Sequence, residues 1–174
     1  MSKQELWQIE YNDENTTDNR YLTFRADNQL FGISIREVVQ IVGMQEITQL
    51  PDHPSYIKGV ISLREDIIPV IDVRVRFGRP QGAYDDRTCI IITKLPEGSY
   101  GFIVDEVDEV CDLLPEQIIL PPQVKSEISN CRYLKGIAHL SKGLDKREKT
   151  ILIIVASELL EEHELVELSR VTEN

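Results

Sequence analysis

Short apolar or alternating runs, rich in Val, Ile, Phe and Tyr, cover most of the chain from Tyr21 onward. Gly, Pro, Asn and Asp separate these runs, which is typical of strands joined by turns. The pattern therefore predicts an all-β fold. The predicted strands are Tyr21–Arg25, Leu30–Ile35, Glu46–Leu50, Ile57–Leu63, Ile67–Val73, Cys89–Thr93, Tyr100–Val104, Leu134–Leu140 and Thr150–Val155.

Three segments depart from the strand pattern. The spacing of Val38, Val39 and Val42 predicts a short helix over 36–42, after the second strand. Ser157 is a suitable N-cap and acidic residues follow it in the sequence, which predicts a C-terminal helix and tail within 158–174. The polar run 12–19 cannot bury enough apolar area to offset its ordering entropy, so we expect 1–19 to form a flexible arm.

The strands fall into two diverged copies of one unit. Phe31–Val38 aligns with Tyr100–Val107, and Tyr56–Leu63 aligns with Tyr133–Leu140. A third match places Ile67–Ile71 against Ile151–Val155, and the second copy has extra residues within 115–130. A sheet of about five short strands has to close on itself or pack against a partner to protect its edges. We therefore predict two small barrels side by side, one in 20–83 and one in 84–157.

Composition narrows the possible partners. The chain has 30 acidic and 19 basic residues, and its formal net charge of −11 disfavours binding to nucleic acid and to anionic lipid. No apolar run approaches the roughly 18 residues that a membrane helix needs, and no signal peptide is recognisable. We therefore expect a cytoplasmic protein. Three widely spaced cysteines without a C-x-x-C pair favour reduced thiols over disulfides or a zinc site.

Residues suited to catalysis or metal binding are sparse. No nucleophile motif, phosphate-binding loop or zinc-binding motif is present, and His53, His139 and His163 lie far apart. The carboxylates of 105–109 are the best candidates for acid–base chemistry or a hard cation. A solvated acidic edge is the favoured interpretation, because the oxygen spacing of a calcium loop is missing. We expect no enzyme activity, no cofactor and no metal.

Two residues suggest a recognition role. Arg64 interrupts two apolar strands at a predicted turn, where it serves either as a solubilising charge or as a fixed recognition group. Pro69 lies in a run that otherwise reads as a buried strand, and proline favours an edge or a bulge. Its neighbours Ile68 and Val70 then belong either to an ordinary bulge or to an exposed apolar edge that docks a partner.

Several segments together resemble one known family. They are Tyr21–Phe24, Phe31–Ile33, Tyr56–Val60, Leu63–Arg64, Ile68–Asp72 and Arg74–Phe77. Their Ile-Lys-Gly-Val-x-x-Leu-Arg and Ile-Pro-Val-Ile-Asp motifs are similar to those of the CheW chemotaxis coupling proteins. The resemblance implies two SH3-like five-stranded β-barrels without catalytic activity. It also implies an adaptor that links the cytoplasmic tip of methyl-accepting chemotaxis receptors to the regulatory domain of a CheA-type histidine kinase, at membrane receptor clusters.

The resemblance also suggests which residues bind partners. Val38, Lys58, Gly59 and Arg64 match family positions implicated in receptor or kinase coupling. The chain departs from the family at two sites, with Gln40 where a carboxylate is common and Glu65 where Gly usually follows the Arg. An ion pair between Arg64 and position 40 is then replaced by a hydrogen bond at most, and Glu65 is a competing partner. With the apolar edge, the predicted protein-binding residues are Val38, Gln40, Lys58, Gly59, Arg64, Glu65, Ile68 and Val70.

Two alternatives stay open from the sequence. The first is a generic SH3-like module that binds extended or proline-rich peptides, which requires an exposed aromatic cluster such as Tyr21, Tyr56 and Phe77. The second is a coupling protein of a chemosensory pathway unrelated to motility, which the departures at Gln40 and Glu65 permit.

Overall fold

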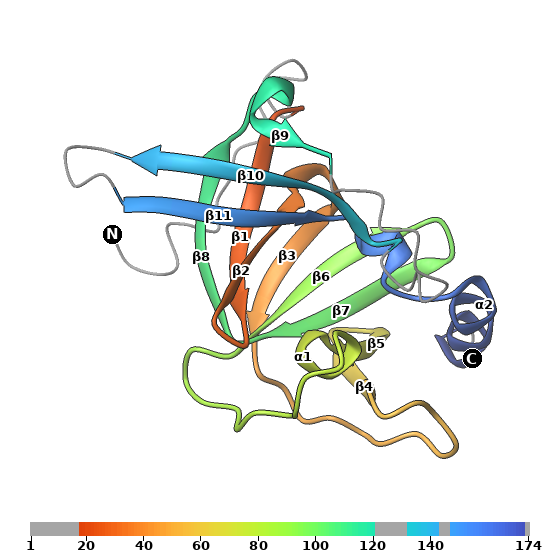
Figure 1. The fold of residues 1–174 in the computed structure, drawn as a ribbon. Coiled ribbons are helices and arrows are strands. Elements are labelled where there is room, and N and C mark those ends of the chain that lie inside the picture. Colours follow the sequence, from red (N-terminus) through yellow and green to blue (C-terminus); the bar gives the residue numbers. More distant parts are fainter. Residues whose placement is uncertain (1–17, 121–131, 143–146, 173–174) are drawn as a thin grey trace.

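Two β-sheets lie side by side in the computed structural model, which describes residues 18–120, 132–142 and 147–172 (Figure 1). Sheet A has the strand order β8-β1-β2-β11-β10-β9, and sheet B has the order β3-β6-β7-β5-β4. Each forms a small SH3-like barrel, which confirms the predicted all-β class. The strands are β1 (Arg20–Ala26), β2 (Gln29–Ser34), β3 (Val38–Gly43), β4 (Ile57–Leu63), β5 (Asp66–Asp72), β6 (Cys89–Leu95), β7 (Gly98–Val104), β8 (Glu106–Asp112), β9 (Ile118–Ile119), β10 (Leu134–Lys142) and β11 (Arg147–Ile154).

The two copies of the repeat exchange their first hairpins. Sheet A contains the hairpin β1–β2 of the first copy together with β8, β10 and β11 of the second, whereas sheet B contains β6–β7 together with β3, β4 and β5. The first five strands of sheet A, β8-β1-β2-β11-β10, therefore match the five strands of sheet B one by one, and β9 is the additional strand of sheet A. This corrects the predicted division of the barrels into 20–83 and 84–157, because each barrel is completed by strands from the other half of the chain.

The strand register shows which residues of the two copies correspond to each other. Gly32 pairs with Ile153 and Gly101 pairs with Val70, each across a parallel contact between the exchanged hairpin and its host sheet. Val70 is thus the counterpart of Ile153, so the third sequence match was wrong by one residue. A run of consecutive aliphatic residues cannot reveal its own register, since a shift by one leaves the apolar pattern nearly unchanged.

Three local predictions are also wrong. Residues 36–42 form the 3₁₀ turn η2 (Ile35–Glu37) and then β3, because the β-branched side chains there pair with β6 in a strand. The predicted strand 46–50 is reduced to a single bridge between Thr48 and Val60. Pro69 lies in β5, which is an inner strand, but it precedes the first residue that pairs with β7. Its missing N–H therefore costs no hydrogen bond to β7.

Three apolar clusters hold the barrels together. One fills the barrel of sheet A, one fills the barrel of sheet B, and the third lies between the sheets. Strands at the junction are buried on both faces, which explains why they read as continuous apolar runs. A chain of aromatic rings crosses the third cluster. The rings are stacked with centroids 5.7 Å apart for Phe24 and Phe31 and 4.7 Å for Phe31 and Phe77, and the tilted pair of Phe77 and Tyr133 has centroids 4.9 Å apart.

The C-terminal helix is confirmed, although α2 (Glu162–Thr172) begins five residues after the expected cap Ser157. The 3₁₀ turn η4 (Ala156–Glu158) occupies the intervening position, and buried Leu159 and Leu160 follow it. Tyr100 Oη donates a hydrogen bond to the main-chain oxygen of Leu165, 3.1 Å away, which ties α2 to sheet B. No helix among the described residues has the length and apolar character needed to cross a membrane.

Candidate protein-binding surface

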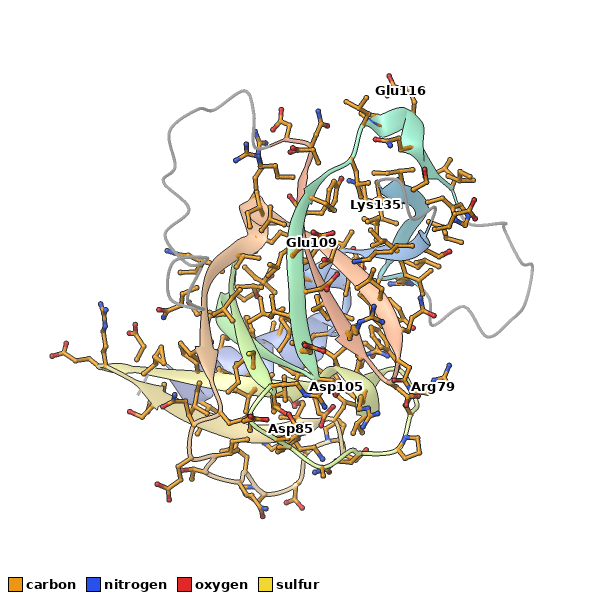
Figure 2. All side chains as sticks on the ribbon, turned by 90° about the vertical axis from the view of Figure 1, so that its left-hand side faces the viewer. Arg79, Asp85, Asp105, Glu109, Glu116 and Lys135 are labelled. Atoms are coloured by element: carbon orange, nitrogen blue, oxygen red, sulfur yellow. The ribbon has the colours of Figure 1, made fainter. Side chains whose placement is uncertain are left out.

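The hairpin β4–β5 carries the most prominent of the predicted binding residues. Its tip consists of Arg64 and Glu65, and Figure 2 shows the two strands, in pale yellow, projecting from the body of the molecule. Arg64 has φ +57°, a left-handed conformation that a residue with a side chain adopts at some cost. Both tip residues are exposed, so the turn presents a positive charge beside a negative one.

The groups expected around Arg64 are not bonded to it. Neither Gln40 nor Glu65 forms a hydrogen bond or ion pair with Arg64 within the part of the chain that the structure describes. Gln40 is exposed on β3, and it follows an extra residue, Val39, at which the register of β3 against β6 shifts. The Arg64 guanidinium therefore faces solvent, where a partner carboxylate can reach it.

Three of the predicted binding residues belong to the core instead. Ile68 and Val70 are buried with Ile61, Ile90 and Ile103 inside the barrel of sheet B. The predicted exposed apolar edge is therefore wrong at both positions, because β5 is covered on one side by β4 and on the other by β7. Val38 is also buried, in the cluster between the sheets.

Lys58 and Gly59 have different roles. Lys58 Nζ lies 2.6 Å from Gln81 Oε1, so its ammonium group holds the loop after α1 (Val73–Arg76) near β4. Gly59 has φ +141°, and a Cβ built there would lie 2.0 Å from the main-chain oxygen of Thr48. Glycine at this position is thus required for the bridge that closes the barrel.

Exposed apolar residues next to the predicted set were missed. Ile67 on β5 and Val39 on β3 are 40% and 54% exposed. Their exposure could not be recognised from the sequence because each lies within a run of consecutive aliphatic residues. Five exposed residues of sheet B remain as candidates: Val39 and Gln40 on β3, and Arg64, Glu65 and Ile67 on the hairpin β4–β5 at the other end of the strand order. We call this set the sheet B surface.

The acidic segment 105–109 forms structural contacts. Asp105 Oδ2 accepts a hydrogen bond from the main-chain N–H of Asp27 at 2.8 Å and lies 3.2 Å from Arg74 Nε. Arg74 also donates to Asp27 Oδ1 at 3.0 Å, and Lys149 Nζ lies 3.1 Å from Asp108 Oδ2. In Figure 2, Asp105 lies at the lower end of β8, at the junction of the two sheets. Residues 106–112 form a paired strand, and the residues described contain no cluster of three or more possible metal ligands.

A second polar contact lies beside this network. The Tyr84 hydroxyl donates to Asp72 Oδ2 at 2.7 Å, while Asp72 Oδ1 accepts from the N–H of Val75 and caps α1. Burial, followed by the neighbouring Asp72 carboxylate, raises the pKa of Tyr84 well above its ordinary range. Tyr84 is therefore a neutral donor that positions the loop, and Asp72 is a structural carboxylate.

Comparison with known proteins agrees with this arrangement. A family model described as the CheW-like domain matches residues 20–164. The chain is 30% identical over 159 residues to chemotaxis protein CheW of Klebsiella aerogenes, covering 91% of this chain and 92% of that protein. It is 34% identical over 107 residues to chemotaxis protein CheW of Bacillus subtilis, covering 62% and 69% of the two chains.

A solved structure supports the same assignment. The crystal structure of scaffolding protein TtCheW from Thermoanaerobacter tengcongensis superimposes with a TM-score of 0.67 and 34% identity, covering 78% of this chain and 88% of that chain. Family model, curated relatives and fold thus agree over most of the chain, from the first strand to the C-terminal helix. The chain belongs to the CheW-like family of chemotaxis coupling proteins.

Proposed function

We propose that the chain is a non-catalytic adaptor that couples methyl-accepting chemotaxis receptors to a CheA-type histidine kinase. Membership of the CheW-like family carries this proposal, and the exposed tip of the β4–β5 hairpin supports it. A free guanidinium beside an exposed isoleucine suits an interface, because Arg and apolar anchors dominate binding energy. The adaptor acts in the cytoplasm and is recruited to membrane receptor clusters by its partners.

The sheet B surface is the kinase- or receptor-binding site in this proposal. Arg64 supplies a positive charge for a partner carboxylate, and Ile67 and Val39 supply apolar contact. Gln40 and Glu65 modify the polarity and charge around these groups. Lys58 lies near the start of β4, at the other end of the strand from Arg64, and acts as a positioning residue through its bond to Gln81. The remaining predicted residues contribute by stabilising the fold, and they are Val38, Gly59, Ile68 and Val70.

Titration calorimetry tests the proposal directly. Purified chain is titrated with the regulatory domain of a CheA-type kinase, and separately with the cytoplasmic fragment of a methyl-accepting receptor. We expect Arg64→Ala and Ile67→Ser to fold normally and to weaken binding to at least one partner by about tenfold, as loss of an interface anchor does. Absence of binding to both partners at high micromolar concentration would count against the coupling function.

Matched controls separate binding from folding. Lys94→Ala removes an exposed positive charge from β6, and Val166→Ser removes an exposed apolar side chain from α2. Both are expected to bind like the unmodified chain. If Arg64→Ala unfolds the protein, Arg64 is a structural residue. A pathway unrelated to motility is distinguished by the receptor that co-purifies with the chain.

The peptide-binding alternative lacks the surface it needs. Tyr21 is buried, Phe77 lies between the rings of Phe31 and Tyr133, and Tyr56 faces the Arg76 guanidinium. An aromatic groove built from Tyr21, Tyr56 and Phe77 is therefore not available for a proline-rich ligand.

A further inference from the structure

An ion pair of sheet A marks the point where its barrel closes. Lys149 Nζ, on the hairpin β10–β11, lies 3.1 Å from Asp108 Oδ2 and 3.7 Å from Glu109 Oε1 on β8. Figure 2 shows Glu109 midway along β8. Two strands separate β8 from β11 in the strand order, so these partly buried side chains meet across the closed barrel rather than between paired strands.

The register of the two hairpins identifies the counterpart of the lysine in sheet B. Asp66 pairs with Leu63 in the hairpin β4–β5. In the same way, Lys149 pairs with Leu140 in the hairpin β10–β11. Asp66 therefore occupies in sheet B the position that the lysine occupies in sheet A, directly after the exposed tip of the hairpin.

The edge strands β8 and β3 have equivalent bulges. In β8, Asp108 and Glu109 lie opposite the single residue Thr23 of β1. In β3, Val39 and Gln40 lie opposite a single residue of β6. Val39 is thus the counterpart of Asp108, and Gln40 is the counterpart of Glu109. The hairpin β4–β5 accordingly brings position 66 toward the bulge of β3.

The charges at this point differ between the two barrels. Sheet B has the acidic Asp66 in place of the lysine, and it has an apolar side chain and an amide in place of the two carboxylates. Asp66 and Gln40 are exposed, and Val39 is 54% exposed. Asp66 forms no hydrogen bond or ion pair with any residue that the structure describes. The cation that neutralises this point in sheet A is therefore missing from the equivalent position of sheet B.

We propose that the partner bound at the sheet B surface supplies this cation, as a lysine or arginine side chain that pairs with Asp66. This inference rests on the proposed adaptor function. The aliphatic stem of such a side chain packs on Val39, and Gln40 Oε1 is a further acceptor for its N–H groups. The net charge of −11 also favours a basic group on the partner, because opposite charges attract across an interface.

Arg64 adds a second requirement for the partner. Its guanidinium, at the tip of the same hairpin, calls for a partner carboxylate, whereas Asp66 calls for a partner cation. The sheet B surface therefore selects a partner segment with one acidic and one basic side chain. A segment with two acidic side chains is disfavoured, because one of them lies against the Asp66 carboxylate.

Titration calorimetry tests the partner contact. The regulatory domain of a CheA-type kinase and the receptor fragment are each titrated with the unmodified chain and with Asp66→Asn, at several salt concentrations. We expect Asp66→Asn to weaken binding of one partner about three- to tenfold and to reduce the salt dependence of its affinity, because an interfacial ion pair is lost. Asp86→Asn, which removes an exposed carboxylate from the loop before β6, is expected to change neither quantity.

A second set of variants tests the equivalence of the two barrels without a partner. Val39→Asp combined with Gln40→Glu places two carboxylates near Asp66, and we expect the unfolding midpoint to fall by about 2–4 °C. Addition of Asp66→Lys recreates the charges of sheet A, so the midpoint should recover by a similar amount. The triple variant should also lose binding to the partner. Circular dichroism verifies that all variants are folded.

The outcomes separate this inference from the adaptor function. If the unmodified chain binds neither partner, both fail. If it binds, but Asp66→Asn binds equally well or no more weakly than Asp86→Asn, the adaptor function stands and the inference is wrong. A midpoint that does not recover on addition of Asp66→Lys also overturns it, because Asp66 then does not lie at the bulge of β3. A loss of affinity specific to Asp66→Asn, together with recovery of the midpoint, supports a basic partner residue at this point.

Discussion

Arg76 Nε donates a hydrogen bond to the main-chain oxygen of Leu159 at 2.5 Å. The guanidinium carbon of Arg76 lies 5.5 Å from the ring centroid of Tyr56 and 5.5 Å from that of Tyr133. These tyrosines occupy equivalent positions in the two copies of the repeat, so one cation contacts both copies and the segment that leads to α2. Arg76 is therefore a junction residue, and its role follows from the exchange of hairpins.

Arg76→Ala is expected to lower the free energy of unfolding by about 2–3 kcal/mol, because it removes a charged hydrogen bond and two cation–π contacts. Urea unfolding followed by circular dichroism measures the loss. Arg79→Ala is the control, since Arg79 is more exposed and only forms a 3.5 Å ion pair with Asp27. Its expected effect is about 0.5 kcal/mol or less. Equal losses for both variants would contradict the junction role.

Gly32→Ala and Gly101→Ala are expected to destabilise the fold to a similar extent. A Cβ would lie 2.9 Å from Ile153 Cδ1 at position 32 and 2.7 Å from Ile90 Cγ2 at position 101. Overpacking of this kind costs about 1–3 kcal/mol. Gly43→Ala is the matched control, because nothing lies within 4 Å of the added Cβ. Unfolding midpoints that fall in all three variants would argue against a packing cause.

Gly59→Ala distinguishes a structural role from a recognition role. The substitution combines a φ of +141° with a clash against the Thr48 oxygen, so we expect it to cost about 2–4 kcal/mol of stability. Lys58→Ala should change stability by less than about 1 kcal/mol, because the bond to Gln81 is exposed. Unchanged stability together with lost partner binding in Gly59→Ala would assign the glycine to recognition.

Glu164 should make α2 docking sensitive to pH. Its carboxylate is buried and accepts from the N–H of Glu161 at 2.8 Å, and burial raises its pKa above the ordinary 4.5. The unfolded chain therefore loses this proton at a lower pH than the folded chain, and stability falls as pH rises above 4.5 through the folded pKa. Glu164→Gln should remove this fall and be more stable at neutral pH. Glu167→Gln, at an exposed site on the same helix, should retain most of the slope, because burial is the larger cause of the raised Glu164 pKa and the Glu167 charge the smaller one.

The sequence determined the fold class and the repeat, because both depend on local pattern. Alternating apolar residues select strands, and paired glycines appear where the barrels are too tight for a Cβ. The family motifs around Lys58 and Arg64 could also be recognised from the sequence alone. The same local reasoning failed at 36–42, where three valines at helical spacing form a strand because β6 offers a pairing edge.

The tertiary structure alone decided which strands complete which barrel and which residues face solvent. Hairpin exchange depends on packing between segments that are not adjacent in the sequence, such as β2 and β11 or β5 and β7. The same packing buries Ile68 and Val70 and exposes Ile67, although all three are aliphatic neighbours on one strand. A run of consecutive apolar residues indicates that a strand is buried. Only the neighbours of the strand in space decide which of its faces stays exposed to bind a partner.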